Sequence, residues 1–299
     1  MKFKKIVSVD HTKLQDRALE GLQQLSEQKI EVYDDYPDSE EEILKRIEGA
    51  DAVLVSWHTR LDENIISQCP GLKYIGMACS LYDDSSANVA VNYARGKGIK
   101  VTGIKDYGDP GVAEFIISEV IRLLHGLGKH QWREMPEELT GRKIGIVGLG
   151  TTGKLLAKCL LPFGPDLYYF SRTRKEEWEK KGVKYLPLPQ LLEKTEIISF
   201  HLPKNTVLLD KPEFSKLGKG KILINTSLGL PFKEAAFKDW IKEPGNFAIF
   251  DADGKKQLSV EVEKFFNVFI SDKSAGWSSE TEKRLSEKVI KNLRNYLDQ

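Results

Sequence analysis

The sequence lacks long hydrophobic runs, is poor in cysteine and has no excess of charge of either sign. Its longest apolar runs are much shorter than a membrane span, so no membrane partner is expected. Only three cysteines occur, Cys69, Cys79 and Cys159, and none forms a CxxC pair, which favours a reducing compartment and predicts a cytoplasmic protein. With 45 basic and 44 acidic residues, nothing favours a nucleic-acid partner. The five histidines show no metal-ligand spacing, so no metal site is expected.

What the sequence does contain is a regular alternation of short β-branched runs with longer helical patterns. Such alternation indicates α/β architecture with parallel sheets and crossover helices, and 299 residues suggest two domains. The first five runs begin at Ile6, Glu31, Ala52, Tyr74 and Val101. Six further runs, the number in a complete dinucleotide-binding sheet, begin at Ile144, Leu167, Ile197, Ile222, Phe247 and Val268.

Two helical segments differ sharply in composition. Residues 112–125 are apolar on nearly all sides, which predicts a buried helix between the two domains. Residues 279–297 form a polar amphipathic pattern, which predicts a helix with one buried face.

A glycine motif follows the run at Ile144 and opens a helix over 154–161. The stretch from Gly148 through Gly150, Thr151 and Thr152 to Gly153 fits G-x-G-x-x-G. Gly148 permits a tight turn, Gly150 lets the backbone approach a pyrophosphate, and Gly153 lets the helix pack close to the strand. The helix N-terminus then offers N–H groups to the phosphates. The alternative is a glycine-rich turn without a ligand.

The next strand ends at Phe170 and is followed by a basic loop. A site for NAD(H) usually has a carboxylate here, which accepts a hydrogen bond from the ribose 2′-hydroxyl. This chain has Ser171, Arg172, Thr173 and Arg174 instead. Two arginines and two hydroxyls can receive a 2′-phosphate, so NADP(H) is the preferred cofactor and NAD(H) is possible. The alternative is a solvated basic loop.

The order of motifs along nearly the whole chain resembles that of the D-isomer-specific 2-hydroxyacid dehydrogenase superfamily. The resemblance implies a central Rossmann cofactor domain, residues 109–276, inserted into a flavodoxin-like substrate domain, residues 1–108 and 277–299. It also implies that the chain is a homodimer and that the nicotinamide lies between the domains. The motifs that carry it are 72–75 (LKYI), 112–114 (VAE), 139–141 (LTG), 201–203 (HLP), 224–226 (INT) and 275–277 (AGW).

The family's catalytic residues are replaced, so the chain resembles a divergent member. Leu228 lies where the family has an arginine that grips the substrate carboxylate, and Lys273 lies where it has the proton-shuttling histidine. The orienting glutamate has no counterpart in residues 253–257. The loop that wraps the substrate carboxylate is altered over residues 79–84. Because a leucine cannot pair with a carboxylate, a standard 2-keto acid loses its main anchor.

Several side chains are candidates for the remaining chemistry. Lys273 is the first candidate for the proton donor, with Asp83 and His58 as other catalytic candidates, although a solvated lysine or loop residue is the alternative. The resemblance places a second group near the cofactor, namely His201, Pro203, Asn225, Thr226 and Asp251. Expected substrate contacts are Trp57, Cys79, Ser80, Tyr82, Asp84 and Leu228.

Three functions are compatible with these residues. The first is an NADP(H)-dependent oxidoreductase that transfers a hydride to a C=O or C=N group of a small molecule other than a standard 2-keto acid. The second is a conventional D-2-hydroxyacid dehydrogenase whose missing residues are replaced from elsewhere. The third is a catalytically inactive dinucleotide sensor or scaffold.

Overall fold

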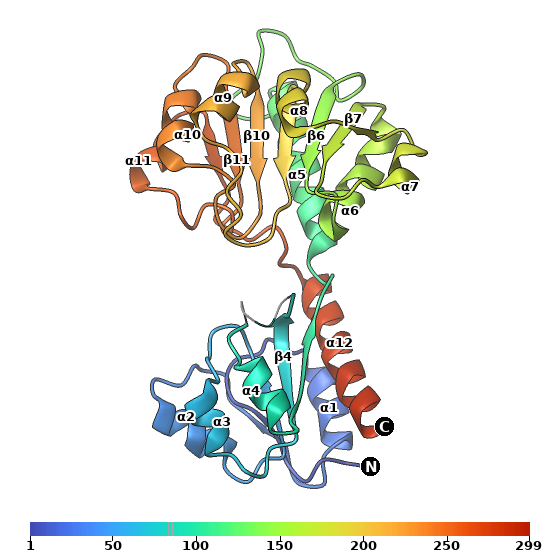
Figure 1. Cartoon of the computed structure of the whole chain (residues 1–299), viewed down its shortest axis with the longest axis vertical. Helices are drawn as coiled ribbons and strands as arrows, with labels where there is room; N and C mark the ends of the chain where they lie inside the picture. The colour runs from blue at the N-terminus through green and yellow to red at the C-terminus, as the bar shows by residue number, and fades with distance from the viewer. Residues whose placement is uncertain (83, 85–86) are drawn as a thin grey trace. The chain divides into compact units, whose positions relative to one another are not determined.

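The computed structural model describes residues 1–82, 84 and 87–299, which form two compact units (Figure 1). One unit comprises Met1–Tyr107 together with Ser278–Gln299, and the other comprises Gly108–Trp277. Each boundary differs by one residue from the one expected from the sequence. The final helix therefore belongs to the first unit, although it is distant from it in the sequence.

The first unit contains a five-stranded parallel sheet. Its strand order is β2-β1-β3-β4-β5, which is the flavodoxin-like order, so the expected fold of this unit is confirmed. The strands β1, β3 and β4 are almost fully buried, because helices cover a parallel sheet on both faces. The strands are β1 (Ile6–Ser8), β2 (Glu31–Val32), β3 (Ala52–Val55), β4 (Tyr74–Ser80) and β5 (Lys100–Ile104), and the helices are α1 (Asp16–Gln24), α2 (Glu40–Ile47), α3 (Glu63–Ser67), α4 (Val91–Gly96) and α12 (Ser279–Leu297).

Helix α12 has the bounds that the sequence pattern predicts. The Ser278 side chain caps its start by accepting a hydrogen bond from the backbone N–H of Thr281 at 3.1 Å. Its buried stripe includes Leu285, Val289 and Leu293, at the spacing of one helix face. That face packs on β4, β5 and α1, and Figure 1 shows α1 and α12 side by side.

The second unit contains a seven-stranded parallel sheet of order β12-β11-β10-β9-β6-β7-β8. This order extends the Rossmann arrangement by one strand, so the expected fold is confirmed. All six expected strands are present, and β8 is an additional edge strand that was not predicted. The strands are β6 (Lys143–Val147), β7 (Asp166–Phe170), β8 (Lys184–Tyr185), β9 (Ile197–Phe200), β10 (Ile222–Asn225), β11 (Phe247–Phe250) and β12 (Val268–Ile270). The helices are α5 (Asp109–His125), α6 (Thr151–Leu160), α7 (Glu176–Glu179), α8 (Leu188–Lys194), α9 (Lys211–Leu217), α10 (Glu234–Ile241) and α11 (Val260–Glu263), with a 3₁₀ turn η1 (Leu161–Phe163).

Helix α5 is the apolar helix of the sequence analysis, and it begins three residues earlier than expected. It packs against α6, which follows the glycine motif. The fully buried positions Ala113, Ile116 and Val120 lie on one face, whereas Phe115 and Ile117 are only partly buried. The sequence pattern therefore overstated the burial of the helix within its own unit.

Candidate active site

The glycine motif forms the turn between β6 and α6. Gly148 has φ +98°, and its N–H donates to the carbonyl of Phe170 at 2.8 Å. A Cβ at Gly148 would lie 2.1 Å from the His201 carbonyl oxygen, and a Cβ at Gly153 would lie 2.2 Å from the Gly148 carbonyl oxygen. Any side chain at these two positions would clash with a backbone carbonyl oxygen of the protein itself, so both positions require glycine.

Gly150 differs from the other two glycines of the motif. It is exposed, and a Cβ built on it would meet nothing within 4 Å. Helix α6 begins after it without a side-chain cap, because the N-cap residue is Gly150 itself, so the first N–H groups of the helix are not satisfied by a capping side chain. Open space in front of an uncapped helix start fits a pyrophosphate.

The two threonines of the motif are placed differently. Thr151 is exposed at the helix start, whereas Thr152 is partly buried and its hydroxyl donates to the carboxylate of Asp109. Asp109 is the first residue of α5, so the contact links the beginnings of two helices. Asp109 was not predicted as a site residue, because nothing in the sequence around it indicates that its side chain reaches α6.

The basic loop after β7 contains one paired arginine and one unpaired arginine. Arg174 forms an ion pair with Glu179, with Nε 3.1 Å from Oε1. Arg172 is exposed and forms no ion pair with any residue in the described part of the chain. Ser171 is partly buried and Thr173 is exposed. The loop therefore offers one uncommitted guanidinium and two hydroxyls.

Asn225 ends β10 and is fully buried. Its amide nitrogen donates to the carbonyl oxygens of Gly229 at 3.2 Å and Gly254 at 3.1 Å, and its amide oxygen accepts from the Ser227 N–H at 3.2 Å. Both amide hydrogens are therefore committed to holding the loops after β10 and β11. The partly buried Thr226 lies between Asn225 and Ser227.

Ser227 is a positioning residue that the sequence analysis missed. Its hydroxyl donates to the Phe200 carbonyl at 3.0 Å and accepts from the Leu202 N–H at 3.1 Å. The loop after β10 is thereby fixed to the loop after β9, which carries His201 and the exposed Pro203. A small hydroxyl residue gives no distinctive signal in a sequence.

Asp251 follows β11 and is buried. One carboxylate oxygen accepts from the Gly254 N–H at 2.7 Å, and the other accepts from the Ala275 N–H at 2.8 Å. Burial raises the pKa of Asp251, and the two backbone N–H groups oppose that shift. The carboxylate ties the loop after β11 to the loop after β12.

The second of these loops carries Lys273. Its carbonyl accepts from the Ala252 N–H at 3.1 Å, and the neighbouring Ser274 hydroxyl donates to Asp253 at 2.5 Å. The backbone of Lys273 is therefore fixed, while its side chain is exposed.

His201 lies at the end of β9. Its ring is 3.0 Å from the Ser199 hydroxyl, and burial lowers the pKa of His201 to about 4. The imidazole is therefore neutral near pH 7.

An aromatic group lies at the carboxyl ends of the strands in the first unit. The rings of Trp57 and His58 have centroids 3.7 Å apart, and the ring of Tyr36 lies 4.3 Å from that of His58. The buried carboxylate of Asp10 holds the loop before them, because it accepts from the Ser56 N–H at 2.8 Å and the Ser56 hydroxyl at 2.6 Å. Trp57 itself is 57% exposed.

The side chains at the end of β4 and just after it differ in burial and in pairing. Cys79 lies in the core with its thiol 3.7 Å from the Asn88 amide oxygen, and burial raises the pKa of Cys79 to about 12. Asp84 is paired with Arg95 at 2.5 Å, so its charge is not available without breaking that pair. The partly buried Ser80 ends β4 and Tyr82 is exposed, whereas Asp83 lies outside the described residues.

The fold gathers these residues into two sets. In the second unit the glycine turn, the basic loop, His201, Asn225, Asp251 and Lys273 all follow parallel strands of one sheet. They therefore share the carboxyl edge, where open α/β sheets bind ligands. In the first unit Tyr36 follows β2, Trp57 and His58 follow β3, and Tyr82 follows β4, so these residues lie toward the corresponding edge.

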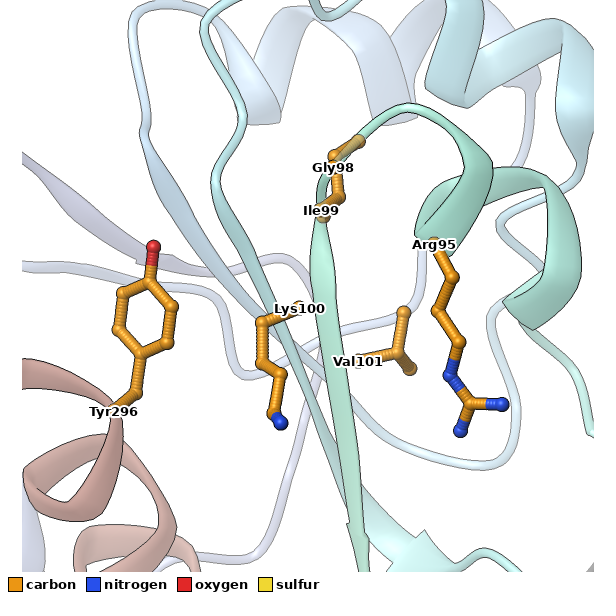
Figure 2. Close-up of a pocket in the computed structure, with 6 residues that line it drawn as sticks. All are labelled: Arg95, Gly98, Ile99, Lys100, Val101 and Tyr296. Carbon is orange, nitrogen blue, oxygen red and sulfur yellow. The ribbon is translucent and has the colours of Figure 1, made fainter. Parts of the chain in front are cut away.

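Among the hollows lined by described residues, two lie in the first unit. The larger, about 370 Å³, is lined by residues that include Arg95, Lys100 and Tyr296, and Figure 2 shows Arg95 and Tyr296 on either side of β5. It lies at the start of β5, away from the carboxyl edge. The smaller, about 260 Å³, is lined by residues that include Tyr36, His58 and Ile65, and it adjoins the aromatic group.

The described part of the chain contains neither a membrane-spanning helix nor a metal cluster. No helix there is both long and apolar enough to cross a membrane. No group of three or more His, Cys, Asp or Glu side chains is arranged there to hold a metal ion.

Comparisons with known proteins agree with this geometry. Residues 117–255 match the family model described as the NAD binding domain of D-isomer specific 2-hydroxyacid dehydrogenases. A hydroxypyruvate reductase of Blautia hydrogenotrophica is 27% identical, over 86% of this chain and 85% of that protein. A protein of Staphylococcus epidermidis (strain ATCC 35984), named among the 2-hydroxyacid dehydrogenases, is 31% identical, over 70% of this chain and 71% of its own. The solved structure of an acyclic imino acid reductase in complex with NADPH and D-Arg shares the fold, with a TM-score of 0.79 and 23% identity over 99% of this chain and 97% of that one.

Proposed function

The chain belongs to the D-isomer-specific 2-hydroxyacid dehydrogenase family, and on this premise we propose that it is an NADP(H)-dependent reductase of an unusual small molecule. Its relatives are NAD(P)-dependent oxidoreductases, and so is this chain. The proposal concerns the finer points. The reduced group is a C=O or C=N group, and the substrate lacks the carboxylate anchor of a standard 2-keto acid.

The observation that supports an unusual substrate is the side chain of Leu228. It is 50% exposed in the loop after β10, at the position where the family resemblance implies a carboxylate-binding arginine. A hydrocarbon side chain offers no charge or donor to a carboxylate, whereas an arginine offers a planar fork. The backbone of this loop is held in place, because the Asn225 side-chain amide donates a hydrogen bond to the Gly229 carbonyl.

The cofactor preference is supported by the loop after β7. It contains no Asp or Glu from Ser171 to Lys175 that could accept from a ribose 2′-hydroxyl. The exposed Arg172 and the hydroxyls of Ser171 and Thr173 suit a 2′-phosphate. The glycine turn and the uncapped start of α6 would hold the pyrophosphate.

Lys273 is the proposed proton donor to the reduced group. The bound nicotinamide would supply the hydride. The ammonium of Lys273 would polarise the acceptor bond and donate a proton to its oxygen or nitrogen. Asp251 supports this role indirectly, because its carboxylate fixes the Ala275 backbone two residues further along the same loop.

The names of several relatives favour a second candidate, a conventional 2-keto acid reductase. The B. hydrogenotrophica relative is a hydroxypyruvate reductase, and a relative from Korarchaeum cryptofilum that is 27% identical is a glyoxylate reductase. In this candidate another cation replaces the missing arginine.

The two candidates differ in their substrates. We would measure NADPH oxidation with glyoxylate, hydroxypyruvate and pyruvate, and then with aldehydes, ketones and cyclic imines that carry no carboxylate. Turnover of the second group with little turnover of the first is expected. Efficient turnover of the 2-keto acids would overturn the first candidate in favour of the second, and tight NADPH binding without any turnover would overturn both.

The same assay tests the proton donor. Lys273→Ala is expected to lower kcat by at least about 100-fold, since positioned acid–base groups contribute about that much. The control is Lys264→Ala, which removes an exposed lysine from the same unit. An unchanged kcat in Lys273→Ala would show that another group donates the proton.

A further inference from the structure

The two arginines of the loop after β7 have the same chemistry but different surroundings. Arg174 donates to Glu179 through Nε at 3.1 Å and through a second guanidinium nitrogen, so its planar fork is matched to one carboxylate. Its guanidinium also lies over the Tyr185 ring, 5.1 Å from the centroid. Rotating Arg174 toward a ligand would break all of these contacts.

Glu179 is in turn held by the core of the unit. The hydroxyl of the fully buried Tyr169 donates to Glu179 at 2.8 Å and accepts from the Lys175 N–H at 2.6 Å. The carboxylate is 23% exposed, while the Arg174 side chain is 61% exposed. The hydrogen bonds from Arg174 and then Tyr169 lower the pKa of Glu179, so it stays ionised near pH 7.

A second carboxylate of α7 pairs with a lysine of α6. Glu177 pairs with Lys154 at 2.8 Å. Arg172, by contrast, has no ion-pair partner among the described residues, and it follows Ser171 at the end of β7. Of the two arginines of the loop, Arg174 is matched to a carboxylate and Arg172 is not, among the residues that the structure describes.

We propose that Arg172 binds the 2′-phosphate of NADP(H), whereas Glu179 is a positioning residue that holds Arg174 away from this phosphate. The strength of the preference for NADP(H) over NAD(H) then depends on the Arg174–Glu179 pair as well as on Arg172. This inference rests on the proposed NADP(H) preference.

The first test compares the two arginines directly. The dissociation constants of NADPH and NADH are measured for the full-length wild type, Arg172→Ala and Arg174→Ala. Arg172→Ala is expected to weaken NADPH binding by about 10- to 100-fold and to leave NADH within about twofold, because only NADPH presents the phosphate. Arg174→Ala is expected to change the ratio of the two constants by less than about threefold. An equal loss of NADPH affinity in both variants would overturn the inference.

The second test releases Arg174. In Glu179→Gln the carboxylate is lost, and the NADPH preference is expected to rise by about 3- to 10-fold as Arg174 becomes free to bind the phosphate. The matched control is Glu176→Gln, which removes the same charge from the exposed first residue of α7. Glu176 acts on Arg174 through its charge but makes no hydrogen bond to it. The control is expected to show a smaller rise.

A double variant separates release of Arg174 from a general effect on the loop. In Glu179→Gln combined with Arg174→Ala, the extra preference is expected to disappear, and Glu179→Asp is expected to restore the wild-type ratio. General loosening of the loop would weaken both cofactors together, and persistence of the gain without Arg174 would overturn the positioning role. If the wild type shows no preference for NADPH, the proposed cofactor fails as well. If the wild type prefers NADPH but both arginine variants lose the same NADPH affinity, only this inference fails and the proposed cofactor stands.

Discussion

The hydroxyl of Thr152 donates a hydrogen bond to the carboxylate of Asp109, and this contact joins the first turn of α6 to the first turn of α5. It places a negative charge beside the helix start that is open in front of Gly150. An anionic pyrophosphate bound at that helix start would meet a like charge within a few residues.

We therefore predict that Asp109→Asn strengthens dinucleotide binding. An asparagine keeps an oxygen that can accept from Thr152, but it removes the charge. Two like charges that face each other across a partly solvated site interact by roughly 1 kcal/mol, so affinity for NADPH and NADH should rise by about 3- to 10-fold. Isothermal titration measures this, with Asp239→Asn on the exposed face of α10 as the matched control. Equal affinities in Asp109→Asn and the wild type would show that the carboxylate does not act on the phosphates.

A second prediction concerns pH and His201. The pKa of His201 is about 4 in the folded protein and about 6.5 when unfolded, because burial disfavours the charged ring. Between these values the unfolded chain binds more protons, so the free energy of unfolding falls as the pH is lowered through this window. The effect is absent above about pH 7 and reaches at most about 3 kcal/mol below about pH 4.

Urea unfolding at several pH values measures this contribution. His201→Gln should flatten the dependence between about pH 4 and about pH 6.5, while His125→Gln, at the exposed end of α5, should leave it unchanged. Identical slopes for His201→Gln and the wild type would mean that the ring is not shielded in solution.

The fold could be predicted largely because parallel strands are short apolar runs separated by helices. Helix α12 was predicted with its observed bounds, since a serine cap and a regular buried stripe define it. Strand β8 was missed, because two residues, Lys184 and Tyr185, on the edge of the sheet carry no periodic signal. The burial of Cys79 was also missed, because a strand covered on both faces shows no alternation.

The candidate site was predictable where a backbone contact forbids a side chain, as at Gly148 and Gly153. The site was not predictable where a residue's role depends on which side chains contact each other in the folded protein. The sequence indicates two equivalent arginines, whereas the turn at α7 brings Glu179 back to Arg174 and not to Arg172. The contact between Thr152 and Asp109 spans 43 residues and likewise depends on packing of two helices.

A third prediction separates two roles of Asp251. Both of its oxygens accept backbone N–H groups, and an asparagine can replace only one of them. Leaving a buried N–H without a partner costs about 1–3 kcal/mol, so Asp251→Asn should lower the free energy of unfolding by about that amount. Asp272→Asn, an exposed neighbour of Lys273, is the control in denaturant unfolding. Full stability with weakened cofactor binding would instead assign Asp251 to direct contact with the nicotinamide.

The last prediction restores the missing carboxylate anchor through Leu228→Arg. The position can accept a longer side chain, because Leu228 is 50% exposed and the Asn225 amide fixes the backbone at Gly229. A charge-assisted, bidentate hydrogen-bonded pair between an arginine and a carboxylate is worth about 1.5–3 kcal/mol, so kcat/KM for glyoxylate and hydroxypyruvate should rise by at least about 10-fold. Val207→Arg adds the same charge at another half-exposed position of the same unit and should have no such effect. An unchanged kcat/KM in Leu228→Arg would mean that Leu228 is not what excludes 2-keto acids, and the proposed substrate would lose its main support.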